Sequence, residues 1–352
     1  MNYRRFIFSV GTTAMIALLP AAQAHHAIAG NFDMSQHIVL QDAVLTEFRF
    51  VNPHVYIYVD VPGDDGTTEA WRCEMSAANH LRKRGWTAET LLPGQEMTVN
   101  GAPARREANV CHVGVITLPD GTELSGSVGR PSAELVQGTL ILAEDVETRQ
   151  RYLPNGQPNL GGPWVATVES LDMTRVDATP EGAQAGAGLV RHFDSPALSC
   201  EPTNIVLDWI FEREQNSISQ SADTVTLHYG YLEQARTVHL DQVEHPADLM
   251  PSRLGHSVGR WDGDVLVVDT IGFEPGVFDY AGELGFTMHS SAWRVVERFS
   301  VSDDGLVLSR EYTFTDPLFM EGSYSGSDTA SLTNEPLVPY NCEELSGENN
   351  RR

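Results

Sequence analysis

The chain has 352 residues, with 23 basic and 48 acidic side chains, and a formal net charge of −25. A surface of that charge repels other polyanions, which argues against nucleic acids and anionic membranes as partners. The length predicts two domains, each able to bury its own core.

Residues 1–24 have the three parts of a secretory signal peptide. Arg4 and Arg5 form the basic region, Phe6 to Leu19 the apolar region, and Ala22-Gln23-Ala24 the small-x-small cleavage site. The apolar region is short for a transmembrane helix, and no second one follows. We therefore expect a periplasmic or secreted protein without an integral membrane segment after cleavage; an uncleaved anchor is the alternative. Cleavage leaves 21 basic and 48 acidic residues, a net charge near −27.

The N-terminal part of the mature chain predicts an OB-like five-stranded barrel over residues 25–118. A short helix at 76–85, with Ser76 as N-cap and Gly85 as stop, interrupts the strands. The strands are expected at 38–50, 54–61, 68–74, 96–101 and 110–117. The order βββαββ is that of an OB fold, which places the third strand beside the fifth. That neighbourhood predicts a disulfide between Cys73 and Cys111, because cysteines of exported proteins are usually paired.

Several motifs in this part resemble a known family. They are HHAIAGNFD, VLTEFRFVNPHVYIYVDV, LRKRGW and LLPGQEMTVNG. Together they resemble DUF6152, a family of exported bacterial proteins of unknown function, over about residues 25–118. The second half, with RTVHL, EHPADL, GHSVGRWDGDVLVVDT and VVERF, resembles a region often fused to that family. The resemblance implies export and a two-part architecture, and it supplies no catalytic residues.

Residues 119–199 are turn-rich and are expected to form a connector. Thr179-Pro180-Glu181 has the N-cap, N1 proline and first-turn acid of a helix start, which predicts a short helix over 180–192.

Residues 200–345 predict an antiparallel meander that closes as a lipocalin-like β-barrel, with a twisted sandwich as the alternative. The strands are expected near 203–212, 215–220, 223–229, 234–240, 254–261, 264–271, 291–301, 305–314 and 320–332. Cys200 and Cys342 bracket this meander, so we expect them to form its disulfide. Residues 346–352 are expected to be a disordered tail.

The clearest element of the second half is a hairpin over residues 253–271. Asp262-Gly263 is a typical two-residue turn, because both positions tolerate positive φ. With those two residues as the loop, His256 faces Asp269 and Arg260 faces Val265 on one side of the hairpin. Trp261, Leu266 and Val268 lie on the other side.

The His256–Asp269 pair suggests an active site, because a carboxylate beside an imidazole fixes its tautomer and raises its basicity. This hypothesis requires the face with His256 and Arg260 to point into the barrel. His239, Glu297, Arg298, Arg310 and Glu311 lie on other strands, and some of them must also point inward. Ionisable groups inside a barrel are costly unless they bind something. The alternative is that Trp261, Leu266 and Val268 form the core and His256 faces solvent.

The mature N-terminus suggests a copper site. Cleavage after Ala24 would leave a free α-amine on His25, and the amine and imidazole together can chelate one copper ion. Cu(II) favours such tetragonal nitrogen sites. A third nitrogen from His26, His54 or His112 would complete the site. A frayed, solvent-exposed terminus is the alternative.

Three functions therefore remain open. The first is an exported protein that binds a small apolar or amphipathic molecule in the C-terminal barrel. The second is a lyase, isomerase or hydrolase that uses His256, Asp269 and Arg260. The third is a copper-binding protein that uses His25. No G-x-S-x-G, phosphate loop, H-E-x-x-H or C-x-x-C motif points to another enzyme class. The oligomeric state is not indicated.

Overall fold

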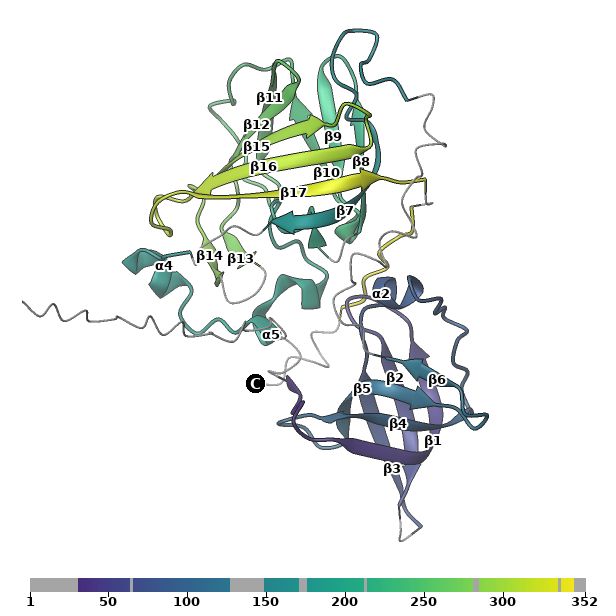
Figure 1. The fold of residues 1–352 in the computed structure, drawn as a ribbon. Helices are drawn as coiled ribbons and strands as arrows, with labels where there is room; N and C mark the ends of the chain where they lie inside the picture. The colour runs from purple at the N-terminus through teal and green to yellow at the C-terminus, as the bar shows by residue number, and fades with distance from the viewer. Residues whose placement is uncertain are drawn as a thin grey trace, which may run out of the picture.

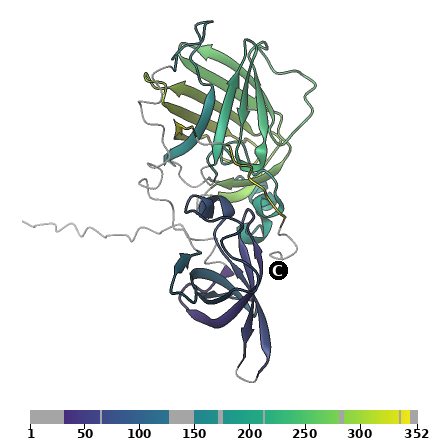
Figure 2. The same ribbon diagram turned by 90° about the vertical axis from the view of Figure 1, so that its right-hand side faces the viewer.

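The computed structural model describes residues 31–63, 66–126, 149–170, 176–211, 214–280, 285–334 and 337–344. Two barrels, one from each half of the chain, lie next to each other (Figures 1 and 2). The predicted signal peptide, His25, His26 and the predicted C-terminal tail lie outside the described residues. No helix in the described part of the chain is long and apolar enough to cross a membrane.

The small barrel has the predicted order of strands. Its elements are β1 (Ile38–Arg49), β2 (Tyr56–Pro62), β3 (Thr68–Glu74), α2 (Ala78–Arg82), β4 (Glu96–Pro103), β5 (Val110–Thr117) and β6 (Glu123–Ser125). Neighbouring strands follow the order β3-β2-β1-β4-β5-β6, and a parallel pairing of β3 with β5 closes the barrel. The predicted OB-like barrel is therefore confirmed, with β6 as an added edge strand.

The closing pair of strands carries the predicted disulfide. Cys73 pairs with Cys111 across β3 and β5, and the two residues are joined with their Cα atoms 4.4 Å apart. The predicted N-cap of the helix is wrong. Ala77 occupies the N-cap position, and the Ser76 backbone N–H donates to the carbonyl of Gly126 at 3.0 Å.

The large barrel is closed by nine strands in the order β10-β11-β12-β15-β16-β17-β7-β8-β9. Their bounds are β7 (Gly162–Ser170), β8 (Gln215–Gln220), β9 (Thr224–His228), β10 (Ala235–His239), β11 (His256–Asp262), β12 (Val265–Ile271), β15 (Arg294–Val301), β16 (Val307–Thr315) and β17 (Tyr324–Leu332). The predicted closed barrel is confirmed. Its first strand, β7, lies in the segment that was expected to be a connector. It belongs to the barrel because it pairs with both β17 and β8.

The predicted strand at 203–212 is wrong, because local side-chain bonds turn the backbone there. The Asn204 side-chain oxygen accepts from the N–H groups of Val206 and Leu207 at 3.1 and 2.9 Å. Asp208 accepts from the Thr203 N–H at 3.2 Å. Such side-chain bonds compete with a strand ladder. The buried side chains of this segment, which we call the plug (residues 203–211), join the hydrophobic core of the large barrel.

Smaller elements lie between the strands of the large barrel along the chain. They are α4 (Pro180–Ala185), α5 (Arg191–Asp194), two 3-10 turns at Pro196–Ser199 and Tyr231–Glu233, and the hairpin of β13 (Gly276–Tyr280) with β14 (Gly285–His289). Thr179 caps α4 as predicted, since its hydroxyl accepts from the Gly182 N–H at 3.0 Å. The predicted end at residue 192 is wrong, because α4 stops at Ala185, just before Gly186. Cys200 and Cys342 form the second predicted disulfide.

Candidate functional site

The hairpin of β11 and β12 has a different turn from the predicted one. Asp262 pairs with Val265, so the loop is Gly263-Asp264. Gly263 alone has a positive φ, of 60°, within the turn. A glycine at the first central position is the requirement of a type II′ turn, whereas the prediction assumed type I′. His256 therefore pairs with Ile271 and Asp269 with Val258, so the predicted direct pairing is wrong.

The face of this hairpin that carries His256 points away from the barrel core. A two-residue shift in the paired positions preserves the faces, so His256, Arg260 and Asp269 still share one side. The opposite side supplies Leu266 and Val268 to the core, and Trp261 packs against it. Arg260 is exposed. The inward orientation that the active-site hypothesis required is therefore wrong, and the alternative orientation, with Trp261 on the core side, is the one observed.

A histidine cluster covers the outer face instead. The Nδ1 atoms of His256 and His245 are 2.9 Å apart, and the His239 ring stacks on His256 with centroids 5.0 Å apart. His245 Nε2 lies 3.7 Å from Asp269 Oδ2, and Arg294 binds both oxygens of Asp269 at 2.7–2.8 Å. Burial lowers the pKa of His256, and the neighbouring His245 and His239 lower it further. His245, from a loop that sequence patterns did not place, thus lies between the two predicted partners.

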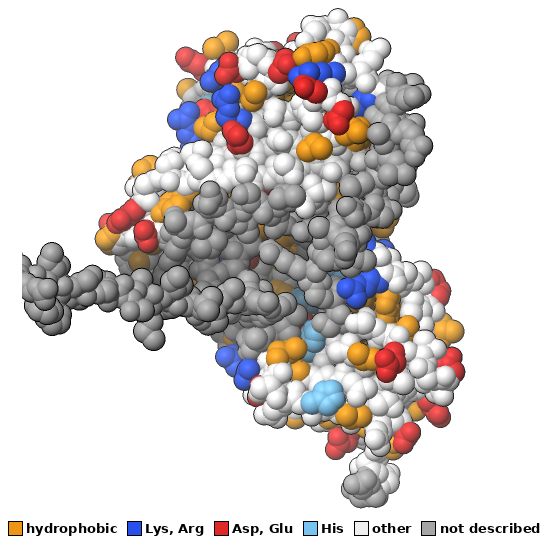
Figure 3. Space-filling model, in the orientation of Figure 1, with side chains coloured by type: hydrophobic (Ala, Val, Ile, Leu, Met, Phe, Trp, Pro, Cys, Tyr) orange, Lys and Arg blue, Asp and Glu red, His pale blue; other side chains and the backbone are white. Residues whose placement is uncertain are grey.

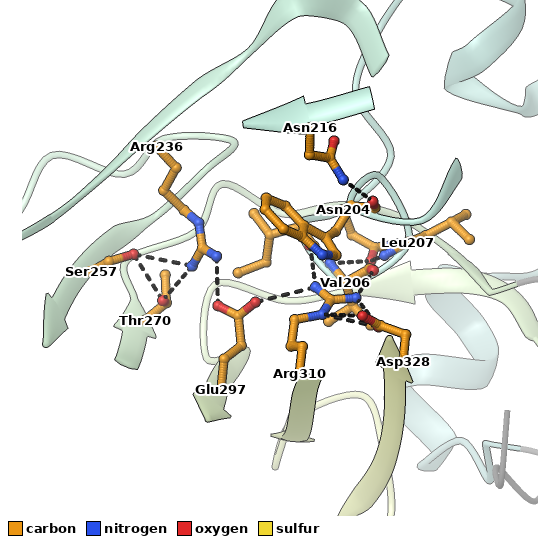
Figure 4. Close-up of polar contacts among 12 residues, drawn as sticks. Asn204, Val206, Leu207, Asn216, Arg236, Ser257, Thr270, Glu297, Arg310 and Asp328 are labelled. Atoms are coloured by element: carbon orange, nitrogen blue, oxygen red, sulfur yellow. Dashed lines mark hydrogen bonds and ion pairs between the residues drawn. The ribbon is translucent and has the colours of Figure 1, made fainter. Parts of the chain in front are cut away.

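A second set of ionisable residues lies inside the large barrel (Figure 4). Glu297 lies between two arginines, with Arg236 Nη2 at 2.6 Å from one oxygen and Arg310 Nη1 at 3.2 Å from the other. Arg310 also contacts Asp328 at 2.6 Å. All four residues are at most 4% exposed. The expectation that some ionisable residues point inward is thereby confirmed for Glu297 and Arg310.

The interior network fixes the plug. Arg310 donates to the backbone carbonyls of Ile205 and Val206 at 3.3 and 2.8 Å, and Arg236 donates to the hydroxyls of Ser257 and Thr270 at 3.3 and 3.0 Å (Figure 4). Two guanidinium groups oppose two carboxylates, so the formal charges cancel. An arrangement of this kind explains how the barrel tolerates buried charge without a bound ion.

A third set of ionisable residues lies on the small barrel. The parallel register of β3 and β5 places Glu74 opposite His112. His54 follows the cis peptide bond between Asn52 and Pro53, and its Nδ1 lies 3.1 Å from one Glu74 oxygen. The Tyr56 hydroxyl donates to the other Glu74 oxygen at 3.2 Å. Histidine side chains are visible on the surface of the small barrel (Figure 3).

His112 is buried beside this pair. Burial lowers the pKa of His112, the carboxylate of Glu74 opposes that effect, and His54 adds to it. The ring of Phe32 packs on the His112 ring with centroids 5.4 Å apart. His54 is less buried, with 31% of its side chain exposed. Because Glu74 engages its Nδ1, the Nε2 of His54 is the nitrogen left for another ligand.

A cavity of about 40 Å³ adjoins this set, which is room for a few water molecules. Glu74, Arg72 and Glu107 line it from the barrel, Asn31 and Phe32 from the chain before β1, and Phe193 from α5. The Asn31 carbonyl accepts from the Arg105 N–H at 2.8 Å, and Phe32 forms a bridge with Ala104. The start of the described chain is thus fixed at this cavity.

Within the described ranges, no group of three or more His, Cys, Asp or Glu side chains is arranged to hold a metal ion. His54 and His112 are the predicted metal ligands that the described residues include; His25 and His26 precede them. Sequence patterns missed Glu74 and Tyr56. A signal existed for Glu74, because Glu74 and His112 come directly after the paired Cys73 and Cys111. Tyr56 then pairs with Glu74 across β2 and β3.

Comparisons with known proteins agree with the predicted resemblance. No curated protein and no solved structure matches the chain. Residues 14–111 match the model of DUF6152, a family of unknown function. This match includes His25, His26, His54 and Glu74. In its N-terminal part, the chain is similar to the DUF6152 family.

Proposed function

We propose that this is an exported copper-binding protein, in which the mature N-terminal His25 and the imidazole of His54 hold one Cu(II) ion. The observation that carries the proposal is the fixed orientation of His54. Its Nδ1 is held by Glu74, which Tyr56 holds in turn. A carboxylate behind a ligating imidazole selects the tautomer and raises the basicity of the other nitrogen. The two disulfides are consistent with export, since such bonds persist in oxidising compartments.

The donor set fits the chemistry of copper. The α-amine and imidazole of His25 would supply two nitrogens and His54 Nε2 a third, and three nitrogens suit tetragonal Cu(II). Asn31 lines the cavity beside Glu74, and six chain steps from His25 span at most about 20 Å. A site that takes two of its nitrogens from residue 25 also accounts for the absence of a complete ligand group within the described residues. His112 is the alternative third ligand.

The two other functions have less support. Side chains of the plug fill part of the large barrel, and Arg310 bonds to its backbone, which does not favour an apolar ligand there. Small-molecule binding in that barrel remains a prediction. The His256–Asp269 enzyme hypothesis would now have to use the outer face of the barrel, with His245 between the two residues.

The proposal is tested by titrating Cu(II) into protein that begins at His25, with affinity measured by competition against a chromophoric chelator and ligation by EPR. Acetylation of the α-amine of His25 should weaken binding strongly, because the amine could no longer chelate with the His25 imidazole. His54→Ala should weaken binding and remove one nitrogen from the EPR pattern. His228→Ala, on an exposed residue of β9, is the matched control and should change neither. Equal affinity in the native and Nα-acetylated proteins would contradict the proposal.

A further inference from the structure

Asn52, two residues before His54, is fully buried and uses each of its polar groups. Its backbone N–H donates to the Asn341 carbonyl at 3.3 Å, and its carbonyl accepts from the Glu343 N–H at 2.9 Å. Its side-chain amide donates to the Tyr340 carbonyl, and its side-chain oxygen accepts from the Asn79 N–H at 3.3 Å. Three of these four bonds join Asn52 to residues 340–343, which we call the strap.

The strap is anchored in the large barrel. Cys342 is bonded to Cys200, and the buried Tyr340 packs edge-on against Tyr231 with ring centroids 5.0 Å apart. From the end of β17 the chain runs down to the small barrel and passes close to α2 (Figures 1 and 2). A parallel bridge between Asn52 and Cys342 then places the strap beside the loop that leads to His54.

We infer that the strap positions His54 for metal binding, so that the large barrel sets the copper affinity of the small one; this inference rests on the proposed function. His54 is held on one side by Glu74. On the other side, its backbone is tied to Asn52 through the single residue Pro53. Loss of an outer contact that orients a metal ligand typically lowers metal affinity about 10- to 100-fold.

The two domains are also joined at points that do not involve the Asn52 loop backbone. Arg49 forms an ion pair with Glu343 at 2.5 Å, and the Asn79 side chain donates to Glu214. The bonds to Asn52 are therefore an addition to contacts that already dock the domains. They act on the backbone that leads to His54, which is what a positioning role requires.

Glu343 provides a matched pair of variants for the test. Glu343→Pro removes the backbone N–H that donates to the Asn52 carbonyl and also removes the charge. Glu343→Gln removes the charge and keeps the N–H. Cu(II) affinity and EPR spectra are measured on full-length mature protein that begins at His25. We expect at least about a 10-fold weaker affinity and an altered EPR spectrum for Glu343→Pro, and an affinity within about 2-fold of the native value for Glu343→Gln.

Native affinity and an unchanged spectrum in Glu343→Pro would overturn the inference and leave the proposed function intact. An equal loss in both variants would also overturn it, because the charge and not the backbone bond would then be responsible. A native protein that binds no Cu(II) would overturn both. If Glu343→Pro does not fold, the double variant Cys200→Ser/Cys342→Ser, which frees the strap from its anchor, replaces it and is judged against the native protein by the same affinity and spectrum.

Discussion

The two barrels treat their ionisable residues in opposite ways. In the large barrel, Arg236, Glu297, Arg310 and Asp328 are at most 4% exposed, and each is paired with an opposite charge. On the small barrel, His54 keeps 31% of its side chain exposed and has one nitrogen without a role in the Glu74 contact. A closed network has little capacity left for a ligand, whereas an oriented and accessible imidazole can bind one. Pairing and exposure of the ionisable residues, more than their number, therefore distinguish a structural cluster from a candidate site.

The largest expected effect comes from the disulfide that joins the strap to the large barrel. Cys200–Cys342 spans 142 residues and Cys73–Cys111 spans 38. On the chain-entropy model, the longer loop contributes about 5 kcal/mol to stability and the shorter one about 4 kcal/mol. We expect urea unfolding of the Cys200→Ser/Cys342→Ser protein to show the greater loss. A greater loss on removing Cys73–Cys111 would mean that the small barrel depends on its disulfide for more than loop closure.

Removing one member of the interior network should lower the free energy of unfolding almost as much. Arg310→Met leaves Glu297 without one partner, Asp328 without its guanidinium contact, and the plug carbonyls without donors. Breaking a buried ion pair from one side typically costs about 3–5 kcal/mol. The matched control is Arg298→Met on the neighbouring strand, because Arg298 is exposed and its contact with Asp262 is 3.4 Å long.

The control variant Arg298→Met should lower the free energy of unfolding by at most about 1 kcal/mol. Both variants are measured by urea unfolding monitored by tryptophan fluorescence, since Trp209 packs close to Arg310 in the large barrel. Similar losses for the two variants would contradict the view that the interior network is a structural clamp on the plug.

The sequence was sufficient to predict both barrels and both disulfides, because alternation along strands is a local signal and the four cysteines fall into two couples along the chain. It was insufficient where contacts with distant residues override the local pattern. The apolar run at 203–212 looks like a strand, and only the bonds from Asn204 and the Arg310 guanidinium make it a plug. The ninth strand, β7, was missed because its partners, β17 and β8, lie far along the chain.

The candidate site was predictable to a similar extent. His54 stood out through its NPH motif, and His112 was a candidate ligand. Their convergence on Glu74 depends on the register of β3 with β5. The strap could not be anticipated, because it joins residue 52 to residues 340–343 across the whole chain.

A change of pH is expected to have an effect of moderate size on stability. The effect should arise from a different histidine in each barrel. Each has a buried histidine, His112 or His289, whose pKa is lowered from 6.5, mainly by burial. The folded state therefore binds fewer protons than the unfolded state just below pH 6.5. The stability that each histidine contributes is fully present above that value and falls as the pH drops through it.

Melting of the metal-free protein between about pH 7 and about pH 5 measures this effect. His289→Gln should flatten the pH dependence of the large-barrel transition only, and His112→Gln that of the small-barrel transition only. If either substitution flattened both transitions, the barrels would be unfolding as one cooperative unit.

The smallest effect is expected for His256, the residue whose sequence pattern first suggested an active site. Its imidazole contacts His245 and His239 on the outer face of the barrel and contributes nothing to the core. His256→Ala should therefore change the free energy of unfolding by no more than about 0.5–1 kcal/mol. Hydrogen exchange should become faster in the loop around His245, which loses its contact at 2.9 Å, and should stay unchanged in β12. A loss of several kcal/mol would mean that the histidine cluster fastens the loop to the barrel, and the outer face would then belong with the interior network as a structural cluster.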